Sequence, residues 1–98
     1  MPVDMARAAE LYRRACTTTE KAGCTPLGWL YENGHVGAAD EAAAARFYAE
    51  GCSGGWPRGC GNLAVYYEAG RGGLKRDPER ARQLRARACA GGETAACQ

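Results

Sequence analysis

The 98-residue chain lacks several features that mark common classes of protein. It has no apolar run approaching the roughly 20 residues that a membrane-spanning helix needs, so membrane insertion is not expected. One histidine, His35, and one serine, Ser53, leave few groups for a metal site or a nucleophile. The formal net charge of +2 is too small to indicate a nucleic-acid surface, which is typically strongly basic. We therefore expect no nucleic acid, no metal and no other cofactor.

The first residues, Met1 to Asp4, form no apolar stretch that resembles a signal peptide. Cysteine, in contrast, is abundant: six residues form the even set that is typical of a disulfide framework in an oxidising compartment. A chain of this length is also near the size at which a single core is only marginally stabilising. These observations predict an extracytosolic protein whose targeting segment was removed or belongs to a longer parent chain.

The six cysteines lie in an internal repeat. Asp4, Asp40 and Asp77 each precede a cysteine by 12 positions, and each of these cysteines precedes another by eight. The period is 36 residues and then 37. The resulting pairs are Cys16 with Cys24, Cys52 with Cys60, and Cys89 with Cys97. A period of this length is typical of solenoid proteins.

Each repeat predicts two helices. Apolar or small residues follow each aspartate at offsets of 4, 7, 8, 11 and 12, which is helical spacing, and the aspartate itself stands where an N-cap belongs. We interpret the aspartates as helix starts and not as catalytic acids. A second helix begins just before Cys24 and Cys60 and ends at Gly34 and Gly70, which suit a left-handed C-terminal cap.

The third copy differs from the first two at one packing position. Arg85 stands where the earlier copies have Tyr12 and Tyr48. The last helix of a solenoid has no following repeat to cover it and needs a polar outer face. The arginine therefore indicates the end of the array.

A disulfide within each cysteine pair requires a turn between its members. Residues eight apart on one helix are separated by about 12 Å, whereas Cα atoms that share a disulfide lie within about 7 Å. The intervening segments 17–23, 53–59 and 90–96 carry β-branched, glycine or proline residues that favour turns. Zinc is the competing interpretation, but the chain lacks the close C-x2-4-C pairs of structural zinc sites and the C-x-x-C spacing of redox-active pairs.

The second helix of each unit carries a family signature. The segment 27–34, LGWLYENG, resembles the L-G-x-x-Y-x-x-G signature of Sel1-like repeats, and the segment 63–70, LAVYYEAG, is a weaker copy. The C-x7-C pairs are similar to those of the cysteine-rich, Hcp-like branch of bacterial secreted proteins. Similar stapled repeats occur in an assembly factor of the mitochondrial intermembrane space. The loops at 34–37 and 70–74 depart from the usual G-x-G-V pattern.

This resemblance implies an all-α fold, an α-solenoid of antiparallel helix pairs in a right-handed superhelical array stapled by the three disulfides. We expect one repeat domain, 1–98, with boundaries near 1–20, 21–56 and 57–92 and a truncated last helix at 93–98. The implied location is periplasmic or secreted, or the mitochondrial intermembrane space if the source is eukaryotic. The implied state is a monomer, or weak self-association through the ends of the array.

The resemblance also implies a concave surface that binds a protein or peptide. Seven exposed positions are expected on this surface: Trp29, Glu32, Asn33, Asn62, Val65, Tyr66 and Ala69. Trp29 is the leading contact residue, with packing between repeats as the alternative. We expect Trp56 to cover an edge of the core. The basic residues of segment 75–87 are expected to form a solvated helix face, with an acidic partner as the alternative.

Two other functions stay open. The Hcp-like branch has been associated with binding and slow hydrolysis of β-lactams, but Ser53 is followed by Gly54 and Gly55 and lacks the S-x-x-K arrangement of serine β-lactamases. We therefore expect a binding module more than an enzyme. The remaining possibility is a fragment or minimal array with no partner of its own.

The cysteine pattern predicts the number of free thiols in the native protein. Alkylation under denaturing conditions followed by intact mass measurement is expected to find no modified cysteine without reductant and six after reduction. Six modified cysteines in the untreated protein would contradict the disulfides and would make zinc and a cytosolic location the better interpretations.

Overall fold

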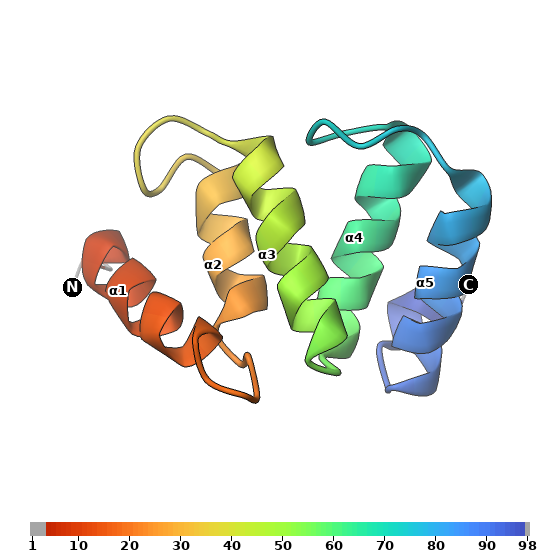
Figure 1. The fold of residues 1–98 in the computed structure, drawn as a ribbon, viewed down its shortest axis with the longest axis horizontal. Helices are drawn as coiled ribbons and strands as arrows, with labels where there is room; N and C mark the ends of the chain where they lie inside the picture. Colours follow the sequence, from red (N-terminus) through yellow and green to blue (C-terminus); the bar gives the residue numbers. More distant parts are fainter. Residues whose placement is uncertain (1–3, 98) are drawn as a thin grey trace.

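The computed structural model describes residues 4–97, and within this range the chain is helical without β-strands. The elements are α1 (Met5–Cys16), α2 (Cys24–Glu32), α3 (Glu41–Ser53), α4 (Pro57–Ala69), α5 (Pro78–Ala90) and a 3-10 turn, η1 (Thr94–Cys97). The helices lie side by side in chain order and alternate in direction along an axis of 39 Å (Figure 1). The chain is thus an α-solenoid, as predicted. Below, α2 and α4 are called first-type helices, although each comes second after its aspartate in the sequence repeat. The helices that begin at the aspartates, α1, α3 and α5, are called second-type helices.

The helix starts confirm the role of the three aspartates. Asp4, Asp40 and Asp77 each accept a hydrogen bond through a carboxylate oxygen from a backbone amide three residues ahead. Each bond is 3.0 Å long, and the donors are Arg7, Ala43 and Arg80. These bonds satisfy amides that have no partner within the helix, and the negative charge favours the positive end of the helix dipole.

Both first-type helices end at a glycine in the left-handed conformation. Gly34 has φ of +72° and Gly70 has φ of +69°. The amide that follows each glycine turns back to a carbonyl of the last helical turn: His35 donates to Leu30, and Arg71 donates to Tyr66, both at 2.9 Å. This is the pattern of a Schellman cap, in which a residue with a Cβ would be strained.

Three disulfides connect each second-type helix to the element that follows it. The pairs are Cys16–Cys24, Cys52–Cys60 and Cys89–Cys97, with Cα separations of 4.5, 4.5 and 4.9 Å. No cysteine within residues 4–97 is free. The predicted pairing is confirmed, and the turns at 17–23, 54–56 and 91–93 bring the two cysteines of each pair together.

The core between the helices is thin because alanine forms much of it. Ala44, Ala64, Ala81 and Ala88 are fully buried, and the largest buried side chains are those of Tyr48 and Tyr66. Small side chains let the helix axes approach closely. The clearest case is Gly28 of α2: a Cβ built there would lie 2.8 Å from Cε1 of the Tyr48 ring and 3.2 Å from the Ala44 carbonyl oxygen.

Substitution of Gly28 by alanine is therefore expected to destabilise the protein. Tyr48 is only 1% exposed and cannot swing away, so the added methyl group should cost about 1 to 3 kcal/mol of unfolding free energy through overpacking. The measurement is denaturant unfolding with the disulfides intact. Gly61→Ala is the matched control in α4, because a Cβ there lies 3.8 Å from the nearest atom, the Ala88 methyl.

For Gly61→Ala we expect no loss of unfolding free energy and a gain of up to about 1 kcal/mol, since alanine favours the helix more than glycine does. Equal effects of the two substitutions would contradict the close helix contact at Gly28.

Candidate functional site

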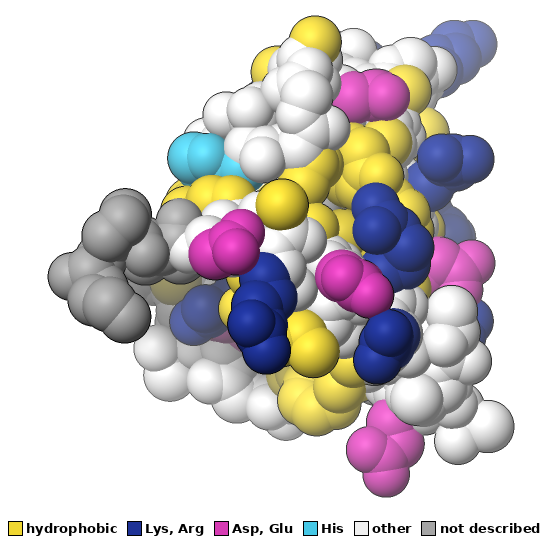
Figure 2. Space-filling model, turned by 90° about the vertical axis from the view of Figure 1, so that its left-hand side faces the viewer, with side chains coloured by type: hydrophobic (Ala, Val, Ile, Leu, Met, Phe, Trp, Pro, Cys, Tyr) yellow, Lys and Arg dark blue, Asp and Glu magenta, His cyan; other side chains and the backbone are white. Residues whose placement is uncertain are grey.

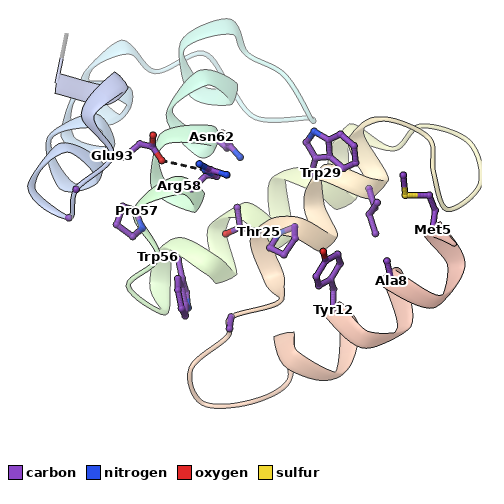
Figure 3. A pocket seen from close by; sticks show the side chains of 15 residues that line it. Met5, Ala8, Tyr12, Thr25, Trp29, Trp56, Pro57, Arg58, Asn62 and Glu93 are labelled. Atoms are coloured by element: carbon purple, nitrogen blue, oxygen red, sulfur yellow. Dashed lines mark hydrogen bonds and ion pairs between the residues drawn. The ribbon is translucent and has the colours of Figure 1, made fainter. Parts of the chain in front are cut away.

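A groove of about 720 Å³ crosses the face of the solenoid that α2 and α4 line. It extends from α1 at one end to the turn before η1 at the other (Figure 3). Its lining is mostly apolar and aromatic, with a few polar groups. The lining residues are Met5, Ala8 and Tyr12 of α1; Ala22 of the following loop; Thr25, Pro26, Trp29 and Leu30 of α2; Trp56, Pro57, Arg58 and Asn62 around α4; and Gly91, Gly92 and Glu93.

The repeat builds this surface from equivalent positions 36 residues apart. Trp29 of α2 corresponds to Val65 of α4, and both are among the exposed large hydrophobic residues, at 46% and 47%. Pro26 corresponds to Asn62, and both are half-buried in the groove wall. The same register is used twice, so the two first-type helices present matching faces, with Trp29 lining the groove and Val65 lining an adjacent hollow of about 260 Å³.

Trp29 lies on the surface and not between repeats. Its neighbours Gly28 and Leu30 are buried, so the turn of the helix directs the indole outward. The ring stacks on His35 with centroids 5.0 Å apart and planes at 28°. The imidazole thus supports one face of the indole, and the indole lines the groove together with Tyr12 of α1 (Figure 3).

Five of the seven expected contact residues are accessible, and three of them, Trp29, Asn62 and Val65, line hollows. Asn62 lines both the groove and an adjacent hollow of about 260 Å³, and Val65 lines that second hollow. Asn33 and Ala69 are exposed at the ends of their helices. The Asn33 amide donates a hydrogen bond of 2.9 Å to the Trp29 carbonyl, which gives it a role in ending α2.

The expectation of an exposed Tyr66 is wrong. Its side chain is 1% exposed and packs edge-on against Tyr48, with ring centroids 5.6 Å apart. Its hydroxyl donates a hydrogen bond to the carboxylate of Glu32, which is half-buried in the same cluster, outside the groove. The repeat register explains the error, because Tyr66 corresponds to Leu30, which is 2% exposed.

The cluster around Tyr66 connects the two repeats electrostatically. The Arg71 guanidinium lies 4.6 Å above the Tyr66 ring and 3.8 Å from the Glu32 carboxylate, and it also pairs with Glu41. Burial, followed by the proximity of Glu32, raises the pKa of Tyr66 and of Tyr48 well above that of a free tyrosine. Both phenols are therefore held neutral.

Sequence reasoning missed several groove residues on α2 and α4. Arg58 lies four residues before Asn62, and Pro26 lies three before Trp29, so helical spacing from those two residues would have found them. Arg58 pairs with Glu93 at the α4 end of the groove, with 3.4 Å between Nε and Oε2 (Figure 3). This ion pair is exposed on the arginine side, so it is expected to rearrange readily around a ligand.

Trp56, which we expected to cover an edge of the core, links two loops and also lines the groove. Its indole N–H donates to the Glu20 carbonyl and so joins the loops of adjacent repeats. The same side chain is 40% exposed and lines the groove. The loop tryptophan is thus a structural link that also offers an aromatic surface.

The other singled-out residues lie outside the groove. Ser53 is exposed at the end of α3 and does not line it. Most arginines of α5 have partners within the protein: Arg82 pairs with Glu79, Arg85 pairs with Glu68, and Arg80 lies over the Tyr67 ring. Over residues 4–97 there is no cluster of three metal-ligating side chains, and no helix is long and apolar enough to cross a membrane.

The raised pKa values predict a loss of stability in alkali. An unfolded tyrosine ionises near pH 10, whereas Tyr48 and Tyr66 ionise at higher pH in the folded protein. Their contribution is fully present below pH 10 and is lost as the pH rises toward the folded values. We expect the unfolding free energy, followed by urea titration between pH 8 and pH 11, to fall above pH 10.

In the double variant Tyr48→Phe/Tyr66→Phe this fall should become shallower, because the two buried phenols are gone. Tyr12→Phe is the control, since it makes the same substitution at an exposed ring outside this buried cluster. An unchanged slope in the double variant would contradict the prediction.

Comparison with known proteins shows which family the chain resembles in sequence and in structure. No curated protein sequence matches the chain. Among solved structures, the chain is similar to Helicobacter pylori cysteine rich protein B (HcpB), at 28% sequence identity and a TM-score of 0.89 over 97% of this chain and 71% of that one. The sequence model of the Sel1 repeat matches residues 1–17, 23–56 and 57–93. Since these segments cover most of the sequence, the chain belongs to the Sel1 repeat family.

Proposed function

We propose that this Sel1 repeat scaffold binds a segment of another protein or a peptide in the groove across α2 and α4. The observation that carries the proposal is the exposure of Trp29 and Val65, two large apolar residues at equivalent positions of successive repeats. An isolated exposed apolar residue is common in proteins, but a repeated one beside a groove of about 720 Å³ indicates a binding surface.

The aromatic residues of the groove suit a polypeptide ligand. Trp29, Trp56 and Tyr12 offer large, fairly rigid surfaces with polar tips, the residue types that dominate binding energy at protein interfaces. Trp29 is held by His35 and Trp56 by its bond to the Glu20 carbonyl, so both rings are positioned before a ligand arrives. A pre-organised surface loses less side-chain entropy on binding.

The polar groups of the groove can orient the ligand. Asn62 offers both a donor and an acceptor for a peptide backbone, and Arg58 and Glu93 place opposite charges at one side. Such groups contribute specificity more than affinity. The groove therefore favours a segment with apolar side chains that also carries polar groups near α4.

The proposed location is an extracytosolic, oxidising compartment, either periplasmic or secreted, or the mitochondrial intermembrane space in a eukaryote. The three disulfides support this, because such bridges persist where the redox environment is oxidising. The likeness to HcpB, whose name describes a cysteine-rich protein, is in keeping with it.

The test is selection of peptides from a displayed random library on the oxidised protein, followed by affinity measurement of the selected peptides. Trp29→Ala is expected to weaken binding by about 30-fold, which corresponds to an interface contribution of about 2 kcal/mol. Asn62→Ala should weaken it by a smaller factor. Gln83→Ala, which changes an exposed residue of α5 away from the groove, should leave affinity unchanged.

Circular dichroism and thiol counts on each variant establish that it is folded and oxidised. Equal affinity of wild type, Trp29→Ala and Asn62→Ala for all selected peptides would refute the groove as the binding site.

A further inference from the structure

The N-terminal end of the solenoid exposes apolar side chains of α1. Leu11 is 56% exposed and Tyr12 is 37% exposed. Figure 2 looks onto this end and shows hydrophobic side chains gathered between basic and acidic ones. The Leu11–Tyr12 face, defined by Ala8, Leu11, Tyr12 and Ala15, has helical spacing and lies on one side of α1.

The same face of α3 shows what covers such a surface. The residues that correspond to Leu11 and Tyr12 are Phe47 and Tyr48, 36 positions later. Phe47 is half-buried and stacks on a tyrosine of α2, Tyr31, with centroids 5.4 Å apart. Tyr48 is 1% exposed and lies against Gly28 of α2. A first-type helix therefore buries this face inside the array.

The C-terminal end is built differently. The expectation that Arg85 provides the polar outer face is wrong, because its position is that of Tyr48, on the side of the preceding helix, and it pairs with Glu68 of α4. On the outer face of α5, Arg82 and Ala86 stand at the positions where α3 has Ala45 and Ala49 against α4. Arg82 is exposed and pairs with Glu79. One end of the solenoid thus carries charge where an interior repeat is apolar, as expected for a solvated end. The other end keeps leucine and tyrosine at its packing positions.

The charges beside Leu11 indicate what kind of helix would cover it. Arg7 and Arg14 lie four residues before and three after Leu11, on the same side of α1. The residue of α3 that corresponds to Arg14 is Glu50, which pairs with Lys21 just before α2. The sign is reversed at α1, where Arg14 pairs with Glu10 of the same helix at 3.0 Å. On a docked helix, an acidic residue at the position equivalent to Lys21 would be a second partner for Arg14.

Arg7 adds a second electrostatic preference. It corresponds to Ala43, in the first turn of α3, and this turn lies beside the end of α2 because the two helices are antiparallel. A helix placed on α1 as α2 is placed on α3 would have its C-terminus near Arg7. The positive charge of an arginine is favourable at the negative end of a helix dipole.

We propose that the Leu11–Tyr12 face is a docking site for a helix of another protein, which packs on α1 as α2 packs on α3. The helix has a small residue opposite Tyr12, apolar residues beside it and an acidic residue just before its first turn. A second copy of this chain does not fit these conditions. Its α2 and α4 are already covered by α3 and α5, and an α1 to α1 contact would bring the like charges of Arg7 and Arg14 of both copies together.

The probe is a helix-constrained synthetic peptide of residues 20–34 that carries Cys24→Ser and Lys21→Glu, titrated into the oxidised full chain. We expect saturable binding, weakened at least about tenfold by Leu11→Arg in the protein and by Gly28→Leu in the peptide. The peptide that retains Lys21 should bind less well than its Lys21→Glu version, and the difference should shrink at high salt.

Two controls locate the site. Ala6→Arg adds the same charge as Leu11→Arg on another side of α1 and should leave affinity unchanged. The face shares Ala8 and Tyr12 with the groove, so the control for the groove is taken at its other end: Asn62→Ala should leave the affinity for this peptide unchanged. Loss of peptide binding by Leu11→Arg but not by Asn62→Ala separates the docking proposal from the proposed function.

Absence of binding at millimolar peptide, or equal binding by wild type and Leu11→Arg, would overturn the proposal. Sedimentation measurements provide the remaining outcome: a dimer of the chain alone that Leu11→Arg dissolves would show that a second copy, not another protein, covers the face. A monomer at all accessible concentrations is the expected result.

Discussion

Close contact between helices, held by covalent bridges, is the constraint on which this structure depends. The core is filled largely by alanine, so each helix pair buries little apolar surface and gains correspondingly little from the hydrophobic effect. Each disulfide closes a loop of eight residues and thereby limits the freedom of the unfolded chain. Glycine at position 28 then lets α2 approach Tyr48 directly. The disulfides and the close contact of α2 with Tyr48 together stabilise a short solenoid whose core is thin.

Contacts between the repeats determine the shape of the groove. Glu32, Tyr66 and Arg71 form a polar cluster that joins α2 to α4 and to the loop beyond it. A second connection, from Trp56 to the Glu20 carbonyl, joins the loops at the other end of the same helices. Because the two first-type helices are connected at both ends, the equivalent residues on their exposed faces keep a constant separation. A ligand that matches this separation meets a surface that is already formed.

The repeat made most of the fold predictable, and it also shows why part of the site was not. The phase of the cysteines and aspartates indicated the helix pairs, the caps and the disulfides, because each depends on local spacing along the chain. Tyr66 was misplaced because its exposure depends on register between repeats, and comparison with Leu30 would have shown it to be buried. Glu93 and Tyr12 come from elements far from Asn62 in sequence. Only the curvature of the array brings such residues to one groove.

The last disulfide has a consequence for the groove itself. Gly91, Gly92 and Glu93 form one wall of the groove, and all three lie within the short segment that Cys89 and Cys97 close. Cys97 is exposed, whereas Cys24, Cys52 and Cys60 are buried. A reductant in solution therefore reaches this bridge more easily than the other two. After its cleavage, only the backbone bonds from Gly91, Gly92 and Glu93 to the end of α5 would hold this wall and keep Glu93 beside Arg58. The shape of the groove is in this way linked to the redox state of its surroundings.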